Sequence, residues 1–199
     1  VKGNSIALLK GERTALNFLQ RMSGIATRTR RFVQAVSGTG AIILDTRKTT
    51  PTLRFLEKYA VKMGGGENHR SSLSEMVLLK DNHLRLVGSI AEAVKAAQKK
   101  TKLGTKIEVE VTNFDQAKEA VEAGASMIML DNMPAKKMKS IIAWMNGRVP
   151  IEVSGNISLN NVRQIARLGA DYISVGKLTH SYASLDISLE FVEGKRERA

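Results

Sequence analysis

Apolar residues recur at two different spacings along this chain. Between residues 12 and 36 they return mostly at every third or fourth position, which predicts one long helix. We expect a weak point in this helix at Ser23-Gly24 and its end at residues 37–40, which include two glycines. From residue 41 the pattern changes to short apolar runs, which predict strands at 41–45, 76–80, 106–111, 127–131, 151–154 and 172–175.

Capping and turn residues predict helices between these strands. Ser89 and Glu92 form a capping-box pattern, which begins a helix that runs to about Lys100. Other helix boundaries are predicted at Asn113, Gly124, Pro134, Gly147, Ser158 or Asn160, and Gly169. Strands that alternate with helices of about 10–15 residues are typical of a parallel sheet.

The choice of fold lies between an open sheet and a barrel. No G-x-G-x-x-G pattern follows any predicted strand, which disfavours a dinucleotide-binding open sheet. A complete eight-stranded barrel usually takes about 250 residues, and this chain has 199. A further strand is a candidate around 185–191. We therefore predict an incomplete or atypical TIM-like α/β barrel of six to seven parallel strands, preceded by a long helix.

The net charge of +12, from 31 Lys+Arg and 19 Asp+Glu, suits nucleic acid, an anionic membrane or small anionic substrates. Only Arg28, Arg30 and Arg31 form a dense basic patch, and just 5% of residues are aromatic, which disfavours nucleic acid. The chain has no cysteine, which excludes disulfides, thiolate metal ligands and cysteine nucleophiles. No apolar run reaches the roughly 18 residues of a membrane span, so we expect a soluble, cytoplasmic protein.

Polar residues gather where the predicted strands end. Barrels and open α/β sheets both carry their sites at the carboxyl edge of the sheet. Two adjacent cations after a buried strand, Arg47 and Lys48, are costly unless an anion meets them. The strand-end residues that we single out are Asp45, Arg47, Lys48, Lys80, Glu108, Glu110, Asp131, Ser154, Gly155, Gly176 and Lys177.

Two carboxylates of this edge suit a divalent metal. Glu108 and Glu110 share a strand face, and Glu110 is expected at the same depth as Asp131 on the next strand, about 4.8 Å away. Mg²⁺ needs only one or two carboxylates and takes its other ligands from water and phosphates. The alternative is that one of these acids forms an ion pair with Lys80 or Arg47.

The glycine-rich segment 64–70 is predicted to bring His69 and Arg70 to the site. It is not a P-loop, because no G-K-[S/T] follows the glycines. The predicted strands 151–154 and 172–175 each lead into a glycine and a helix start, an arrangement that can bind phosphate, although both could be ordinary turns. The sequence leaves the roles of His83 and His180 open.

Together these segments resemble the catalytic domain of the quinolinate phosphoribosyltransferase family (nicotinate-nucleotide pyrophosphorylase, carboxylating). The resemblance runs from about residue 3 to 191 and keeps the order and spacing of the motifs. The matching segments are 11–17, 23–27, 45–51 (Asp-Thr-Arg-Lys-Thr-Thr-Pro), 65–70 (Gly-Gly-Glu-Asn-His-Arg), 79–83, 108–111, 130–132, 154–157 and 175–181.

The resemblance implies an enzyme of NAD biosynthesis. It would convert quinolinate and phosphoribosyl pyrophosphate to nicotinate mononucleotide, pyrophosphate and CO2, with Mg²⁺ bound by Glu110 and Asp131. Lys48 would face the pyrophosphate. The residues implied for quinolinate are Arg47, His69, Arg70 and Lys80, with Arg13 from a second subunit of a homodimer or larger oligomer. Those implied for the 5′-phosphate are Ser154, Gly155 and Gly176, with His180 nearby.

The family also implies a division of the chain. Residues 1–10 would be the remnant of an N-terminal α/β domain that closes the partner's site, 11–192 the barrel domain, and 193–199 a charged tail. Without that domain we expect weak turnover. Two alternatives remain: a homologous barrel with another substrate, such as the molybdenum-transport-associated relative, and a basic non-catalytic module that binds nucleic acid with a steep salt dependence.

Overall fold

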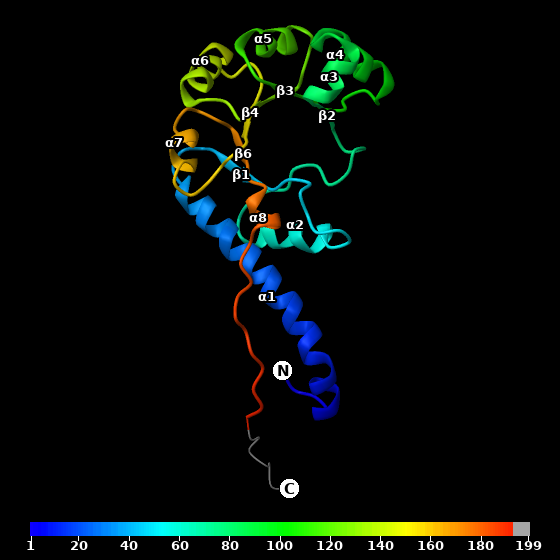
Figure 1. Cartoon of the computed structure of the whole chain (residues 1–199), viewed down its shortest axis with the longest axis vertical. Coiled ribbons are helices and arrows are strands. Elements are labelled where there is room, and N and C mark those ends of the chain that lie inside the picture. Colours follow the sequence, from blue (N-terminus) through cyan, green and yellow to red (C-terminus); the bar gives the residue numbers. More distant parts are fainter. Residues whose placement is uncertain (193–199) are drawn as a thin grey trace.

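Figure 1 shows the computed structural model of the chain, which describes residues 1–192; the predicted charged tail, 193–199, lies outside the described residues. A single long helix, α1 (Ser5–Ala35), forms its amino-terminal part. The helix begins earlier than residue 12, because the side chain of Asn4 accepts the N–H of Ala7 and caps it. The predicted division between residues 10 and 11 falls within α1.

The predicted weak point at Ser23-Gly24 is wrong, because α1 continues through it. Gly24 is buried, and a Cβ atom there would collide with the backbone carbonyl of Ala183. This glycine therefore allows the carboxyl-terminal segment to pack closely against α1. Leu185 N–H donates to the Gln20 carbonyl, and the Gln20 side chain donates to the Ile187 carbonyl, so the segment follows the helix.

All six predicted strands are confirmed, two with the predicted bounds (127–131 and 151–154) and four with slightly shorter ones. They are β1 (Ile42–Leu44), β2 (Val77–Leu79), β3 (Ile107–Val111), β4 (Met127–Asp131), β5 (Ile151–Ser154) and β6 (Tyr172–Ser174). The seventh candidate, 185–191, is wrong: its residues up to 191 form no strand and bond to α1 instead of joining the sheet.

The strands form one parallel sheet in the order β1-β6-β5-β4-β3-β2. This is the cyclic order of a barrel wall that is open between β1 and β2, so the predicted incomplete barrel is confirmed. We call this opening the seam. At the seam, Glu67 N–H donates to the Ile43 carbonyl at 2.8 Å, and Asp45 N–H donates to the Glu67 carbonyl at 3.1 Å.

Helices follow each strand of the wall. They are α2 (Arg54–Met63), α3 (Asp81–Val87), α4 (Ile90–Lys100), α5 (Phe114–Glu122), α6 (Ala135–Met145), α7 (Val162–Ala166) and α8 (Lys177–His180). Of these, α4, α5, α6 and α7 lie around the outside of the wall (Figure 1). The predicted caps Ser89 and Asn113 accept the N–H groups of Glu92 and Gln116. α7 begins later than Ser158 or Asn160, because those residues form a turn before it.

Alternation along the strands separates an apolar outside from a polar inside. Val109, Ile128 and Val153 are fully buried, and all belong to one hydrophobic core. Residues on the opposite face of the strands, such as Glu110, Met129 and Ser154, line a cavity at the carboxyl ends of the strands. Among the helices of residues 1–192, none is both long and apolar enough to cross a bilayer.

Candidate active site

The cavity at the carboxyl ends of the strands has a volume of about 450 Å³. Nine of the twelve predicted site residues line it: Arg47, Lys48, His69, Arg70, Lys80, Glu110, Asp131, Ser154 and Gly155. They come from the segment after β1, from the seam, and from the ends of β2, β3, β4 and β5. The structure thus brings cations, carboxylates and a glycine turn to one place.

The two predicted metal ligands lie at different depths. Glu110 pairs in register with Met129, which places Asp131 two residues further along the sheet. The expectation of equal depth is therefore wrong, because the outward Val109 and Val111 align with Ile128 and Leu130 and set the register. Glu110 and Asp131 still face the same cavity, at a diagonal spacing that long side chains can span.

Glu110 also has a cationic partner. Lys80 Nζ lies 2.9 Å from Glu110 Oε2, so the ion pair that the sequence left as an alternative is present. Lys80 is 48% exposed and Glu110 is 11% exposed. Asp131 accepts only from a neutral neighbour, the amide of Asn132, at 2.8 Å. Glu110 is therefore paired with a cation, whereas Asp131 has no ion-pair partner within residues 1–192.

His69 lies between two buried carboxylates that line the inside of the barrel. Its Nε2 is 3.2 Å from Glu108 Oε2 and 3.3 Å from Glu152 Oε2, and both acids are fully buried. Its Nδ1 accepts the N–H of Arg70 at 2.8 Å, which places the ring proton on Nε2, facing the acids. Both ring nitrogens therefore have partners within the protein, and the imidazole holds the backbone of Arg70.

This cluster binds protons more strongly than its separate members would. Burial opposes the charge of His69, but the contacts with Glu108 and Glu152 outweigh burial and raise the pKa of the imidazole to about 9. Burial, assisted by Glu152, raises the pKa of the Glu108 carboxyl to about 7, although His69 opposes the rise. The pKa values belong to the coupled cluster, and because Nδ1 accepts the N–H of Arg70, the extra proton that the cluster retains in this geometry lies on one of the two acids.

Among the described residues, this cluster is also a group of three possible metal-ligand atoms, all within 4.8 Å of one another. The ring nitrogen already contacts both carboxylates, so we assign no metal there. Glu110 and Asp131 suit Mg²⁺ better, because they face a cavity open to phosphate and water, which would complete the coordination.

Arg70 lines the cavity and also carries a buried donor without an acceptor within residues 1–192. Its Nη1 donates to the Met76 carbonyl at 2.8 Å, while its buried Nε has no acceptor within the described residues. Burial and the nearby Arg47 lower the pKa of the guanidinium. An anion between Arg47 and Arg70 would relieve the repulsion between the two cations.

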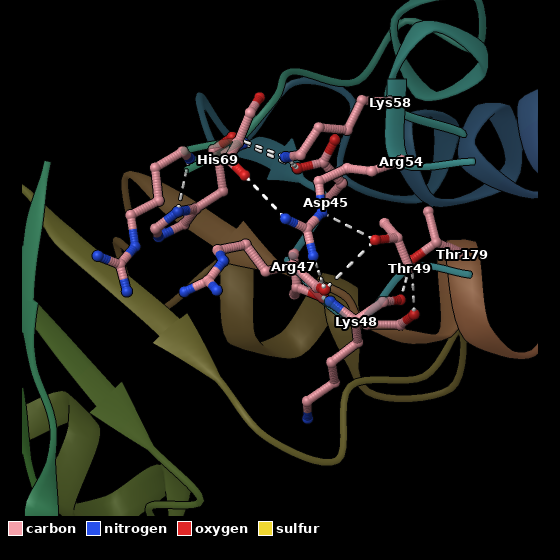
Figure 2. Close-up of polar contacts among 12 residues, drawn as sticks. Asp45, Arg47, Lys48, Thr49, Arg54, Lys58, His69 and Thr179 are labelled. Atoms are coloured by element: carbon pink, nitrogen blue, oxygen red, sulfur yellow. Dashed lines mark hydrogen bonds and ion pairs between the residues drawn. The ribbon is translucent and has the colours of Figure 1, made fainter. Parts of the chain in front are cut away.

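The backbone under Arg47 and Lys48 is held by hydrogen bonds (Figure 2). Thr179 Oγ1 donates to the Lys48 carbonyl at 2.8 Å, and the N–H of Lys48 donates to Thr46 Oγ1 at 3.0 Å. Behind this segment, the buried residues Asp45 and Lys58 form an ion pair of 2.5 Å. Burial raises the pKa of Asp45 to about 6, while Lys58 and His69 oppose the rise.

The two predicted phosphate turns differ in the structure. The Ser154-Gly155 turn lines the cavity, and Gly155 has a φ of +91° with the Asn132 side chain against it. Gly176 and His180 are not among the cavity-lining residues. They lie beside it, since a Cβ at Gly176 would be 3.2 Å from the Lys48 side chain and from the His180 ring.

Arg13 and His83 also lie outside this cavity. Arg13 is exposed on α1, one residue from a shallower hollow lined by Thr14, Asn17 and Phe18. His83 Nδ1 accepts the N–H of Lys80 at 3.0 Å and so caps α3. The role of His83 in this structure is structural.

Sequence reasoning missed several residues of the cavity. Glu152, Asn132, Asn156 and Ser174 line it, whereas Glu108, which the sequence did place near a strand end, lies behind His69. Glu152 could have been found, because it interrupts an apolar strand between Ile151 and Val153 as Glu110 interrupts β3. The asparagines had no such signal, since they follow strand ends as ordinary turn residues do.

Comparison with known proteins places these features in a family. The family described as Quinolinate phosphoribosyl transferase, C-terminal domain, matches residues 25–190. The chain is 46% identical over 188 residues to a Bacillus subtilis protein named probable nicotinate-nucleotide pyrophosphorylase (carboxylating), covering 94% of this chain and 65% of that protein. It is 42% identical over 208 residues to the chloroplastic Arabidopsis thaliana nicotinate-nucleotide pyrophosphorylase (carboxylating), covering 96% and 59%.

A solved structure agrees with this match. The crystal structure of NadC from Streptococcus pyogenes superimposes with a TM-score of 0.91 at 46% sequence identity, covering 95% of this chain and 66% of that one. This chain spans less than two thirds of the length of the two curated relatives above. From its sequence match and its fold, the chain belongs to the quinolinate phosphoribosyl transferase family, whose C-terminal domain it contains.

Proposed function

We propose that this chain is the catalytic part of a quinolinate phosphoribosyltransferase (decarboxylating) that serves NAD biosynthesis. The observation that carries the proposal is one cavity in which Arg47, Arg70 and Lys80 face Glu110 and Asp131. Cations on one side suit a dicarboxylate. Carboxylates on the other suit a metal-bound diphosphate and a sugar that gains positive charge.

Quinolinate would bind to the cationic side. Arg47 and Arg70 would each meet a carboxylate, since both residues line the cavity and a guanidinium group can bind a carboxylate through two N–H groups. Lys80, now paired with Glu110, would add a third cation. His69 would belong to this subsite mainly by holding Arg70 through Nδ1. Arg13, exposed on α1, would reach the site of a second subunit in a homodimer or larger oligomer.

Phosphoribosyl pyrophosphate would bind to the acidic side. Glu110 and Asp131 would hold Mg²⁺, which would neutralise pyrophosphate charge when bound. Lys48 would contact the pyrophosphate, since it lies beside the Gly176 turn at the cavity wall. The Ser154-Gly155 turn would bind the 5′-phosphate with backbone N–H groups, with Gly176 and His180 next to it.

The reaction would then need few protein groups. The ring nitrogen of quinolinate forms a bond to the anomeric carbon as the bond to pyrophosphate breaks. Glu110 and Asp131 stabilise the positive charge that develops on the sugar. The adjacent carboxylate leaves as CO2, and the ring carbon takes a proton in its place.

Calorimetric titration with quinolinate tests the proposal. We expect saturable binding that Arg70→Ala and Lys80→Ala abolish without lowering the melting temperature by more than a few degrees. Arg85→Ala, which removes an exposed cation from α3 outside this cavity, is the matched control and should bind as the wild type does. Absence of binding at millimolar quinolinate, or binding to polynucleotide with a steep salt dependence, would overturn it.

A further inference from the structure

Two cation-bearing segments face each other across the seam of the barrel. The Arg47 segment (45–50) follows β1, and the Arg70 segment (67–71) lies between α2 and β2. Their backbones meet only near Glu67, which bonds to Ile43 and Asp45. Beyond that point, the described residues show no sheet pairing between the segments, so the distance between Arg47 and Arg70 depends on side chains.

Lys58 of α2 connects the segments at a buried position. Its Nζ donates to Asp45 Oδ1 at 2.5 Å and to the His69 carbonyl at 2.7 Å. The same Asp45 oxygen accepts the N–H of His69 at 2.9 Å. Lys58 is 3% exposed and Asp45 is fully buried. One buried ion pair therefore binds the end of β1 to the backbone that carries His69 and Arg70.

Arg54, one turn earlier on α2, connects the segments a second time (Figure 2). Its Nε donates to Thr49 Oγ1 at 2.9 Å, and its Nη2 donates to the Arg47 carbonyl at 3.2 Å. Its Nη1 donates to the Ser71 carbonyl at 3.1 Å. The planar guanidinium thus holds both segments with one rigid group.

Stability alone explains these charges poorly. Removing two charges from water is costly, and replacing a buried ion pair with apolar side chains of similar size is often neutral or stabilising. The one acid of α2, Glu57, is also fully buried and accepts the N–H of Thr50 at 3.1 Å. α2 thus directs three charged side chains to segments that carry cavity cations. Holding these segments in position explains the buried charges better than a gain in stability does.

We propose that Arg54 and Lys58 are positioning residues that set the separation of Arg47 and Arg70, and with it the preference for two adjacent carboxylates over one. The inference rests on the proposed function for the identity of the ligand. Neither residue lines the cavity, so both act through the segments they hold. Together we call them the α2 clamp.

Two measurements test the α2 clamp in the same variants. The variants are Arg54→Met and the double variant Asp45→Asn with Lys58→Met, which leaves no lone buried charge. Lys62→Met, on the exposed face of the same helix, is the matched control. Hydrogen exchange without ligand should accelerate in peptides covering 45–50 and 67–71 in both clamp variants and not in the control.

Calorimetry then compares quinolinate with nicotinate, which has one carboxylate. We expect quinolinate affinity to fall about tenfold to a hundredfold in the clamp variants, since a displacement of about 1 Å can have an effect of that size. Nicotinate affinity should change less than threefold. Accelerated exchange with an unchanged preference for quinolinate, or unchanged exchange, would overturn the inference. If wild-type protein fails to bind quinolinate while exchange behaves as expected, the proposed function fails and the clamp's hold on the segments is supported.

Discussion

The wall of the barrel and its seam hold functional side chains in different ways. In the wall, Glu110, Asp131 and Ser154 belong to strands that are joined by backbone hydrogen bonds, so register places them. At the seam, Arg47 and Arg70 belong to irregular segments that buried charges on α2 hold together. The positions of Glu110, Asp131 and Ser154 should therefore tolerate changes of neighbouring charge, whereas those of Arg47 and Arg70 should not.

The largest effect is expected at the seam, from Lys58→Met alone. This change leaves the fully buried Asp45 without its cation, and breaking a buried pair in this way costs about 3–5 kcal/mol. Denaturant titration measures this cost as a decrease in the free energy of unfolding. The double variant with Asp45→Asn should recover most of the loss. If Lys58→Met costs less than about 1 kcal/mol, the seam does not depend on this pair.

The next effect is a pH dependence from the cluster inside the wall. The pKa of Glu108 is raised to about 7 and that of His69 to about 9, so the folded state binds protons that the unfolded state releases. The stability that Glu108 contributes is complete below its ordinary pKa and is lost as the pH rises through 7; that of His69 is lost towards pH 9.

Thermal unfolding between pH 5 and 9 measures this loss. We expect the free energy of unfolding to decline by roughly 2–3 kcal/mol across the range, because the coupled cluster retains about one proton more than the unfolded chain. Glu108→Gln, which keeps the shape of the side chain, should flatten the decline below pH 8. Glu122→Gln, which changes an exposed acid on α5, is the control. A wild-type protein whose stability increases over this range would contradict the assignment.

A smaller effect is expected at the turn after β5. Gly155→Ala places a Cβ against the backbone and side chain of Asn132 at a φ of +91°, whereas Gly147→Ala, at +75°, meets no atom within 4 Å. Backbone strain alone costs about 1–2 kcal/mol, so both should lose that much and Gly155→Ala more. Binding of phosphoribosyl pyrophosphate should weaken only in Gly155→Ala. Equal losses of stability and of binding would show that close packing at this turn is unimportant.

The smallest effect on stability is expected from Lys80→Met. The Lys80–Glu110 pair is nearly half exposed at the lysine, and such pairs contribute about 0–1 kcal/mol. Quinolinate binding should nevertheless be lost, if Lys80 serves the proposed subsite. Chemical denaturation measures the change in stability, and calorimetry on the same sample measures the change in quinolinate binding. A large loss of stability would show that the pair supports the wall, contrary to its exposure.

Much of the wall could be predicted from sequence because its signals are local. The six strands follow from short apolar runs, and Lys80, Glu110 and Asp131 could be placed at the site because strand ends meet at one edge. The depth of Asp131 could not be predicted, since register depends on how whole strands pair. The prediction of a seventh strand was wrong for a related reason. The 185–191 segment forms hydrogen bonds with α1, and the periodicity of the sequence does not reveal such partners.

The sequence contains fewer local signals for the seam than for the wall, and this difference has a physical cause. Arg47, His69 and Arg70 could be nominated from their motifs, but Lys58, Arg54 and Glu57 resemble the charged face of any exposed helix. Sequence by itself determined an open parallel barrel and the set of cations and acids at its carboxyl edge, because alternation and strand ends act over a few residues. Tertiary structure alone decided that α2 turns its charges inward and that His69 meets Glu108 and Glu152, because burial and pairing depend on residues far apart in the chain.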